Sequence, residues 1–199
     1  MRKLSNENFG GGYLKTKVTV LCALFIAACF FVCSCGSEVI SLENFCFAVR
    51  DFDLAKAEKY VADDTEGYFR NVRSLAEELT EEQAKTAKAI YSHMAFSDFA
   101  EDGGAYTVTV KYVDFAALIN AVNVESSTGA SSLETLSEIV ESGRLQKQFM
   151  KTQSGVRVEY SADSSESTKQ IKLGYSGINS DFTRLLGLDT FLRWYSLQR

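Results

Sequence analysis

An uncharged run near the N-terminus constrains this chain more than any other feature. Residues 18–32 (VTVLCALFIAACFFV) carry no charged side chain, and the lead before them holds four Lys or Arg against one Glu. A basic lead, an apolar run and a small-residue exit are typical of a secretory signal segment. The run is shorter than the roughly 20 residues that a membrane-spanning helix needs. We therefore predict a targeting segment over residues 1–35 and one folded domain over residues 36–199.

The cysteines at the end of this segment indicate how it is processed. The stretch resembles a bacterial lipoprotein signal, in which an aliphatic residue and two small residues precede the cysteine that receives the lipid. Cys35 ends the apolar run and is followed by Gly36-Ser37, whereas Cys29 has the better preceding residues, Ile26-Ala27-Ala28. We favour lipidation at Cys35 and keep Cys29 as the alternative. The resemblance implies an extracytoplasmic protein held at the cell membrane by its N-terminal lipid. A second alternative is an uncleaved signal anchor, since the apolar run can be extended to Cys35.

Charge and composition narrow the function classes for the rest of the chain. The formal net charge is −5, and the targeting segment is basic, so the body alone is more acidic still. An acidic body argues against binding to nucleic acid, because phosphates require clustered Lys and Arg. A single His argues against a multi-His metal site. Cys46 is the one thiol after residue 35, so no intrachain disulfide is expected, and its place between Phe45 and Phe47 predicts a buried, inert side chain.

Helical spacing of apolar residues predicts most of the body. Two capping boxes, Thr80 with Gln83 and Ser131 with Glu134, mark helix starts, and Asp53 and Asp114 are further N-cap candidates. The predicted helices cover residues 38–50, 54–61, 80–93, 115–122 and 131–142, and a continuation of the last past Gly143 to Met150 is an alternative. An amphipathic helical tail is predicted over residues 181–195, with an interruption at Gly187.

Alternating segments predict two antiparallel hairpins. Residues 105–113 (AYTVTVKYV) alternate strictly, and residues 95–100 precede them across a Gly103-Gly104 turn. Residues 156–160 and 170–175 alternate again on either side of a polar loop, which predicts a second hairpin. Helices followed by antiparallel strands indicate an α+β fold, with the helical stretch 115–150 as an insertion between the hairpins.

The first part of the body carries a second resemblance. In the segment FCFAVRDFDLAKAEKYV, a helix containing Ala48 ends at an Asp51-x-Asp53 break, and a second helix follows with Ala57, Tyr60 and Val61. This pattern resembles the opening of the nuclear-transport-factor-2-like fold in exported bacterial proteins. The resemblance implies N-terminal helices packed on a curved antiparallel sheet, which together form a cone whose open end can hold a ligand or a catalytic site.

Candidate site residues follow from that implied cone. The polar and aromatic side chains near its expected sheet are Tyr91, His93, Asp98, Tyr106, Tyr112 and Tyr160. They match no catalytic motif, and the body contains no phosphate-binding loop, nucleophile elbow or zinc motif. We therefore assign no catalytic residue, no metal ligand and no cofactor.

These observations favour a membrane-anchored, extracytoplasmic, non-enzymatic module that binds a small molecule or a protein whose identity the sequence does not give. The alternatives are a small-molecule enzyme or carrier that uses the cone as its pocket, and a signal-anchored accessory protein of the cell envelope. Neither alternative involves nucleic acid. A cavity with buried acid–base groups would favour an enzyme, because general acid–base catalysis needs them within reach of a substrate.

Overall fold

The computed structural model describes residues 37–62, 67–102, 105–127, 129–162 and 169–198. The predicted targeting segment, with Cys29 and Cys35, lies outside the described residues. From Ser37 to Arg199 the chain forms one compact unit.

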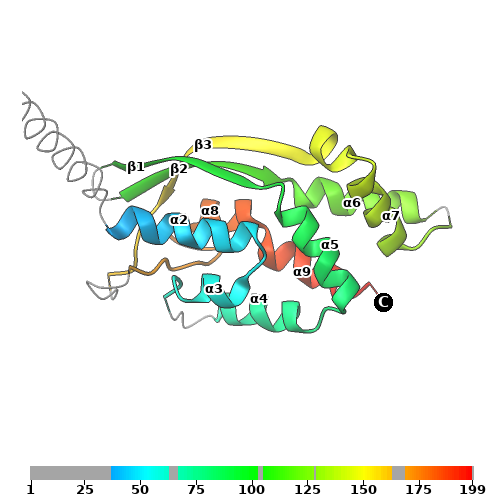
Figure 1. Cartoon of the computed structure of the whole chain (residues 1–199), viewed down its shortest axis with the longest axis horizontal. Coiled ribbons are helices and arrows are strands. Elements are labelled where there is room, and N and C mark those ends of the chain that lie inside the picture. Colours follow the sequence, from blue (N-terminus) through cyan, green and yellow to red (C-terminus); the bar gives the residue numbers. More distant parts are fainter. Residues whose placement is uncertain (1–36, 63–66, 103–104, 128, 163–168, 199) are drawn as a thin grey trace, which may run out of the picture. The chain divides into compact units, whose positions relative to one another are not determined.

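The described residues form an α+β fold, as predicted (Figure 1). Its three strands form one antiparallel sheet in the order β1-β2-β3. The elements in chain order are α2 Ser37–Arg50, α3 Leu54–Glu58, α4 Tyr68–Glu77, α5 Glu81–Tyr91, β1 Ala95–Asp102, β2 Ala105–Val113, α6 Phe115–Ser126, α7 Ser132–Glu141, the π-helix η1 Leu145–Phe149, β3 Met150–Val158, α8 Ser180–Leu186 and α9 Leu188–Tyr195.

The central strand β2 has the two-sided pattern expected from its sequence. Val108 and Val110 are fully buried, whereas Thr107 and Thr109 are only partly buried. β1 pairs with β2 as predicted, and β3 pairs along the other edge of β2 from Tyr106↔Val158 to Val113↔Met150. One face of the sheet is therefore packed and the other faces solvent, as is common for antiparallel sheets.

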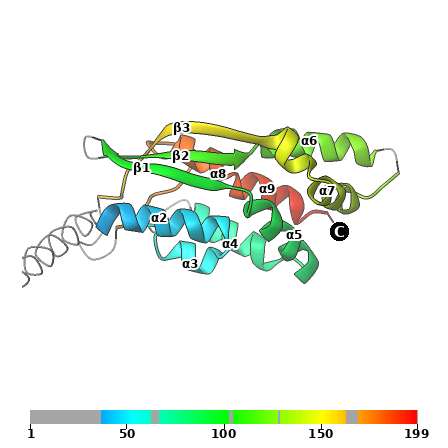
Figure 2. The same ribbon diagram turned by 45° about the horizontal axis from the view of Figure 1, so that its top comes forward.

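Helices α2 and α8 cover the packed face (Figures 1 and 2). Phe45 of α2 and Phe182 of α8 are both fully buried, and their ring centroids are 6.1 Å apart. Cys46 is buried in the same core, as predicted, and burial raises the pKa of its thiol well above the usual value. The space between these helices and the sheet is thus occupied by side chains, at the close packing normal for protein interiors.

The predicted helix starts are confirmed. The Asp53 carboxylate accepts a hydrogen bond from the backbone N–H of Lys56 at 3.0 Å, and Asp114 caps α6 through Ala117 at 3.1 Å. Both capping boxes form, at α5 and at α7. Local side-chain-to-backbone bonding explains why these boundaries can be read from sequence.

The predicted second hairpin is reduced to a single antiparallel bridge between Tyr160 and Ile171. β3 pairs with β2 and not with the 170–175 segment, which forms isolated bridges: Ile171 is paired with Val61 in parallel and with Tyr160 in antiparallel. The buried Asn179 side chain forms hydrogen bonds that a paired strand would otherwise form. It bonds to the backbone of Glu159 and Lys172 at 2.8–3.0 Å. A side-chain clamp of this kind leaves no alternating pattern in the sequence.

Two helix predictions also need correction. The helix from Ser132 ends at Glu141, because Gly143 adopts a left-handed φ of 74°, and Met150 already belongs to β3. The helix predicted over residues 54–61 ends at Glu58. α4 was not predicted, although Tyr68, Phe69 and Val72 bury one face of it at helical spacing.

Candidate functional site: a cavity between α5, α7 and α9

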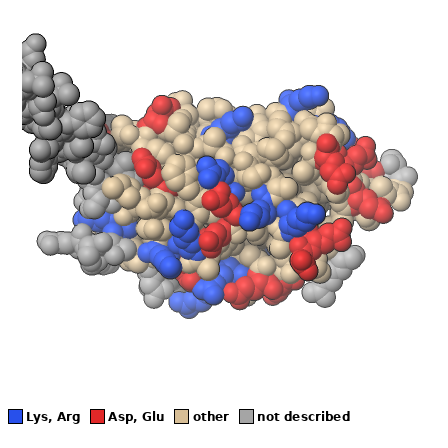
Figure 3. Space-filling view, viewed as in Figure 1, with Lys and Arg blue, Asp and Glu red and all other residues tan. Residues whose placement is uncertain are grey.

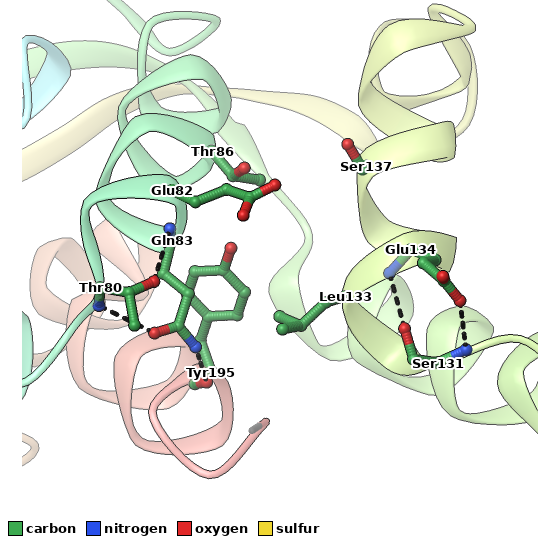
Figure 4. A pocket seen from close by; sticks show the side chains of 9 residues that line it. All are labelled: Thr80, Glu82, Gln83, Thr86, Ser131, Leu133, Glu134, Ser137 and Tyr195. Atoms are coloured by element: carbon green, nitrogen blue, oxygen red, sulfur yellow. Dashed lines mark hydrogen bonds between the residues drawn. The ribbon is translucent and has the colours of Figure 1, made fainter.

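A cavity of about 350 Å³ lies where the N-terminal turns of α5 and α7 face each other (Figure 4). It is lined by Thr80, Glu82, Gln83, Thr86, Ser131, Leu133, Glu134, Ser137 and Tyr195. These residues come from three segments that are far apart in the chain. The cavity is therefore a product of the tertiary fold, and both capping boxes belong to its walls.

The α5 wall is fixed by Gln83. The backbone N–H of Thr80 donates to Gln83 Oε1 at 2.9 Å, and the Gln83 N–H donates to Thr80 Oγ1 at 3.2 Å. The remaining Gln83 donor, Nε2, bonds to the carbonyls of Gln198 at 2.9 Å and Tyr195 at 3.4 Å. One buried amide thus caps α5 and also ties the end of α9 to it.

Tyr195 closes the inner end of the cavity. Its side chain is almost fully buried, and its ring stacks on Phe191 with the centroids 4.9 Å apart. Burial raises the pKa of the Tyr195 hydroxyl, the nearby carboxylate of Glu82 raises it further, and a hydrogen bond with Thr86 lowers it. Figure 4 shows the hydroxyl pointing along α5 towards Glu82 and Thr86. Tyr195 is therefore a neutral, positioned hydroxyl at neutral pH.

The α7 wall is built from side chains that bond within their own helix. The Ser131 N–H donates to Glu134 Oε2 at 2.9 Å, and the Glu134 N–H donates to Ser131 Oγ at 3.2 Å. Bonding to Ser131 holds the pKa of Glu134 below its usual value. Ser137 Oγ donates to Glu141 at 3.2 Å. Glu134 is therefore a carboxylate at neutral pH, and Leu133 adds an apolar side chain to this wall.

The residues predicted from sequence lie elsewhere, and none of the six lines this cavity. Tyr91 is fully buried, with its ring 5.2 Å from Phe52 and 5.4 Å from Phe115, and its hydroxyl has no hydrogen-bond partner among the described residues. Burial raises its pKa well above the usual value. Tyr91 is thus a core residue here.

Two other predicted residues, His93 and Asp98, bond to different partners. A His93 ring nitrogen lies 2.8 Å from Gln146 Nε2, whereas the Asp98 carboxylate accepts from Ser97 Oγ at 3.0 Å in the irregular part of β1. Asp98 is exposed and has a φ of 54°. The structure therefore gives no acid–base pair between His93 and Asp98.

The predicted tyrosines of the sheet are partly brought together. The rings of Tyr106 and Tyr160 meet edge to face with centroids 5.0 Å apart, and the Tyr160 hydroxyl accepts from the Leu42 N–H at 3.0 Å. Tyr112 is half-buried on β2. The Tyr106–Tyr160 pair thus joins α2 to the end of β3, which is a structural role.

Sequence reasoning identified both capping boxes but did not place them at one site. The local signal, Thr or Ser followed three residues later by Gln or Glu, marks a helix start and says nothing about which starts meet. The one available hint was the neutral Gln83, because a Glu cannot donate to carbonyl groups. Tyr195 appeared only as an apolar position of the tail.

Two further features are absent from the described part of the chain. It holds no group of three or more His, Cys, Asp or Glu side chains placed to bind a metal ion. None of its helices has both the length and the apolar character needed to cross a membrane.

Comparison with known proteins adds no relative: no family model, no curated protein and no solved structure matches this chain. The function is therefore argued from its own residues.

Proposed function

We propose that this protein is a lipid-anchored, extracytoplasmic, non-enzymatic binding module. In this proposal the lipid on Cys35, or alternatively on Cys29, holds it at the membrane, and the cavity between α5 and α7 holds a small organic ligand. The single observation that carries the binding role is the cavity itself, at about 350 Å³. That volume is within the usual range for small-molecule sites.

The makeup of the cavity favours binding over catalysis. None of its nine lining residues is a His, Cys or Lys, and the Ser131 hydroxyl and the Glu134 carboxylate, which could serve as nucleophile and base, are already bonded in the cap of α7. The hydroxyls of Thr86, Ser137 and Tyr195 and the apolar side chain of Leu133 are instead suited to orienting a ligand.

The anchor is supported by the sequence pattern. The basic lead, the apolar run and the small residues around Cys35 are those of a lipoprotein signal. One lipid chain gives only reversible membrane binding, so stable anchoring in this proposal requires a second acyl chain. The acidic body adds no attraction to anionic headgroups, so the tether must supply the membrane affinity.

The finer fold assignment is part of the same proposal. The order of α2, the Asp51-x-Asp53 break, α3 and an antiparallel sheet is compatible with a nuclear-transport-factor-2-like cone, with α6, α7 and η1 inserted between β2 and β3. In that case the insertion supplies one wall of the cavity. The ligand site is then at the insertion and not inside the cone, which is occupied by core side chains.

Metabolic labelling with palmitate tests the anchor. The wild-type chain should take up label and partition into detergent. Cys35→Ala should lose the label while Cys29→Ala keeps it, or the reverse if Cys29 is the acceptor. Label retained in both single variants and in the double variant contradicts the lipoprotein proposal. Cys46→Ala is the matched control and should leave the label unchanged, because this thiol is buried.

A further inference from the structure

We propose that the cavity between α5 and α7 takes an organic cation, namely a protonated amine that carries a small apolar body. This inference rests on the proposed binding function and names the ligand class for the same site.

The first argument is charge. Glu82 lies on the α5 wall and Glu134 on the α7 wall, and none of the nine lining residues is Lys or Arg. Figure 4 shows the Glu82 carboxylate extending into the gap between α5 and α7, whereas the Glu134 carboxylate turns away from α5 towards the Ser131 N–H. In the space-filling view, acidic side chains gather over α7, while acidic and basic side chains are mixed over α5 (Figure 3). A cation in the gap would meet the Glu82 carboxylate directly, and none of the lining side chains would oppose it with a positive charge.

The helix N-termini at the cavity are not free to bind an anion. Helix N-termini attract anions through their free N–H groups, and two of them border this cavity. Here, however, the N–H groups of Gln83 and Glu134 already donate to Thr80 and Ser131. The first turns also carry their own carboxylates, from Glu81 and Glu82 on α5 and Glu134 on α7. An anionic ligand would therefore meet charge of its own sign.

The third argument separates an organic cation from a metal ion. The described residues provide no group of three or more metal-ligating side chains, and a single carboxylate facing the gap is too few ligands for a metal ion. The cavity also presents Leu133 and the ring of Tyr195, which suit an apolar body and not a hydrated ion.

The test is a titration of the full chain in detergent micelles, followed by NMR shifts of Leu133, Thr86 and Tyr195. Three probes of nearly equal shape are compared: 2-phenylethylamine as the cation, 2-phenylethanol as the neutral molecule and phenylacetate as the anion. We expect saturable shifts with the amine, with an affinity about ten-fold above that for the alcohol, and no saturation with phenylacetate.

Variants that remove one charge at a time complete the test. Glu82→Gln should weaken amine binding about five-fold, and Glu134→Gln clearly less, because only the Glu82 carboxylate extends into the gap. Gln at position 134 still completes the capping box, so the wall stays folded. Glu81→Gln is the matched control, because Glu81 is in the same first turn but does not line the cavity.

Each outcome is decisive. Equal or tighter binding of the alcohol or of phenylacetate overturns the cation inference but keeps the cavity as a binding site. Amine binding that is equally weakened by Glu81→Gln also overturns it, because the effect is then general surface charge. If none of the three probes moves the cavity resonances, the cation inference fails together with the proposed binding function.

Discussion

The two capping boxes that face each other across the cavity have the same local sequence pattern but different tertiary roles. At α5 the third position is Gln83, which is 7% exposed and bonds to Thr80 and to the carbonyls of Tyr195 and Gln198. At α7 the third position is Glu134, which is exposed and bonds only to Ser131 among the interactions described above. The capping box of α5 therefore also bonds to the end of α9, whereas the capping box of α7 bonds only within its own helix.

The residue type at the third position of a capping box therefore depends on whether another element packs against it. Both Gln and Glu complete a capping box through an oxygen, but only Gln has a spare donor for carbonyls of another element. The negative charge of Glu134 would be costly beside those carbonyls, whereas at the solvent-facing α7 start it is favourable near the helix dipole. The following substitutions test this contrast.

The largest effect is expected from two glycines with a left-handed backbone, one before α9 and one after α7. Gly187 starts α9 with a φ of 61°, and a Cβ at this position would lie 2.2 Å from the Phe115 ring. Gly143 follows α7 with a φ of 74°, and its nearest contact would be an ordinary 3.7 Å to Gln146. Gly187→Ala should lower the free energy of unfolding by about 3 kcal/mol, and Gly143→Ala by about 1 kcal/mol. Urea unfolding measures both.

Because both alanines pay the left-handed backbone cost, the difference between them isolates the clash with Phe115. Equal losses at the two positions would contradict the close packing of α9 against α6. A further check is Phe115→Leu in the Gly187→Ala background, which should recover part of the loss by making room for the methyl group.

A smaller effect is expected when each cap side chain is removed. Gln83→Ala leaves two backbone carbonyls and the Thr80 N–H without their partner, so we expect a loss of about 2–3 kcal/mol. Glu134→Ala removes one exposed cap interaction and should cost clearly less. Thermal unfolding of both variants tests the contrast, and equal losses would show that Gln83 has no anchoring role beyond its own helix.

Exchanging the two side chains should sharpen the same comparison. Gln83→Glu keeps the cap oxygen but loses the Nε2 donor and puts a carboxylate beside two carbonyls, for a loss of about 1–2 kcal/mol. Glu134→Gln should be close to neutral for stability near pH 7. Amide exchange of the last turn of α9 should accelerate in Gln83→Glu only. Acceleration in both variants would contradict the distinct roles.

The smallest effect concerns pH. The pKa of Glu134 is lowered in the folded state by its bonds to Ser131, so ionised Glu134 stabilises the fold at neutral pH. That contribution is lost as the pH falls from the usual carboxyl range through the lowered pKa. Wild type should therefore lose its small advantage over Glu134→Gln in acid, as urea midpoints between pH 7 and pH 3 would reveal. An advantage that grows in acid would contradict the assignment.

The sequence was sufficient where structure is decided locally. Asp53, Asp114 and both capping boxes form hydrogen bonds within three residues, and each predicted helix start is observed. The alternation of β2 reports its one buried face, and Gly187 separates α8 from α9 as predicted. In these cases the residues that interact and the sequence pattern that predicts the interaction lie in the same short segment.

The sequence was insufficient where pairing is decided at long range. The first half of β3 is exposed on successive residues, from Lys151 to Gly155, so it shows no alternation although it pairs with β2. Asn179 replaces a strand by side-chain bonds to residues 7 and 20 positions away. The cavity depends on contacts of α5 with the C-terminus and with α7, and no local pattern specifies these partners.

The most direct test of the central claim is to fill the cavity. Ser137→Phe places a ring on the α7 wall, and Ser127→Phe places the same ring on an exposed position outside the cavity. In a calorimetric titration with 2-phenylethylamine, Ser127→Phe should bind like wild type. Ser137→Phe should bind at least about ten-fold more weakly while keeping its unfolding temperature within a few degrees. Undiminished binding by a folded Ser137→Phe would contradict the assignment of the cavity between α5 and α7 as the ligand site.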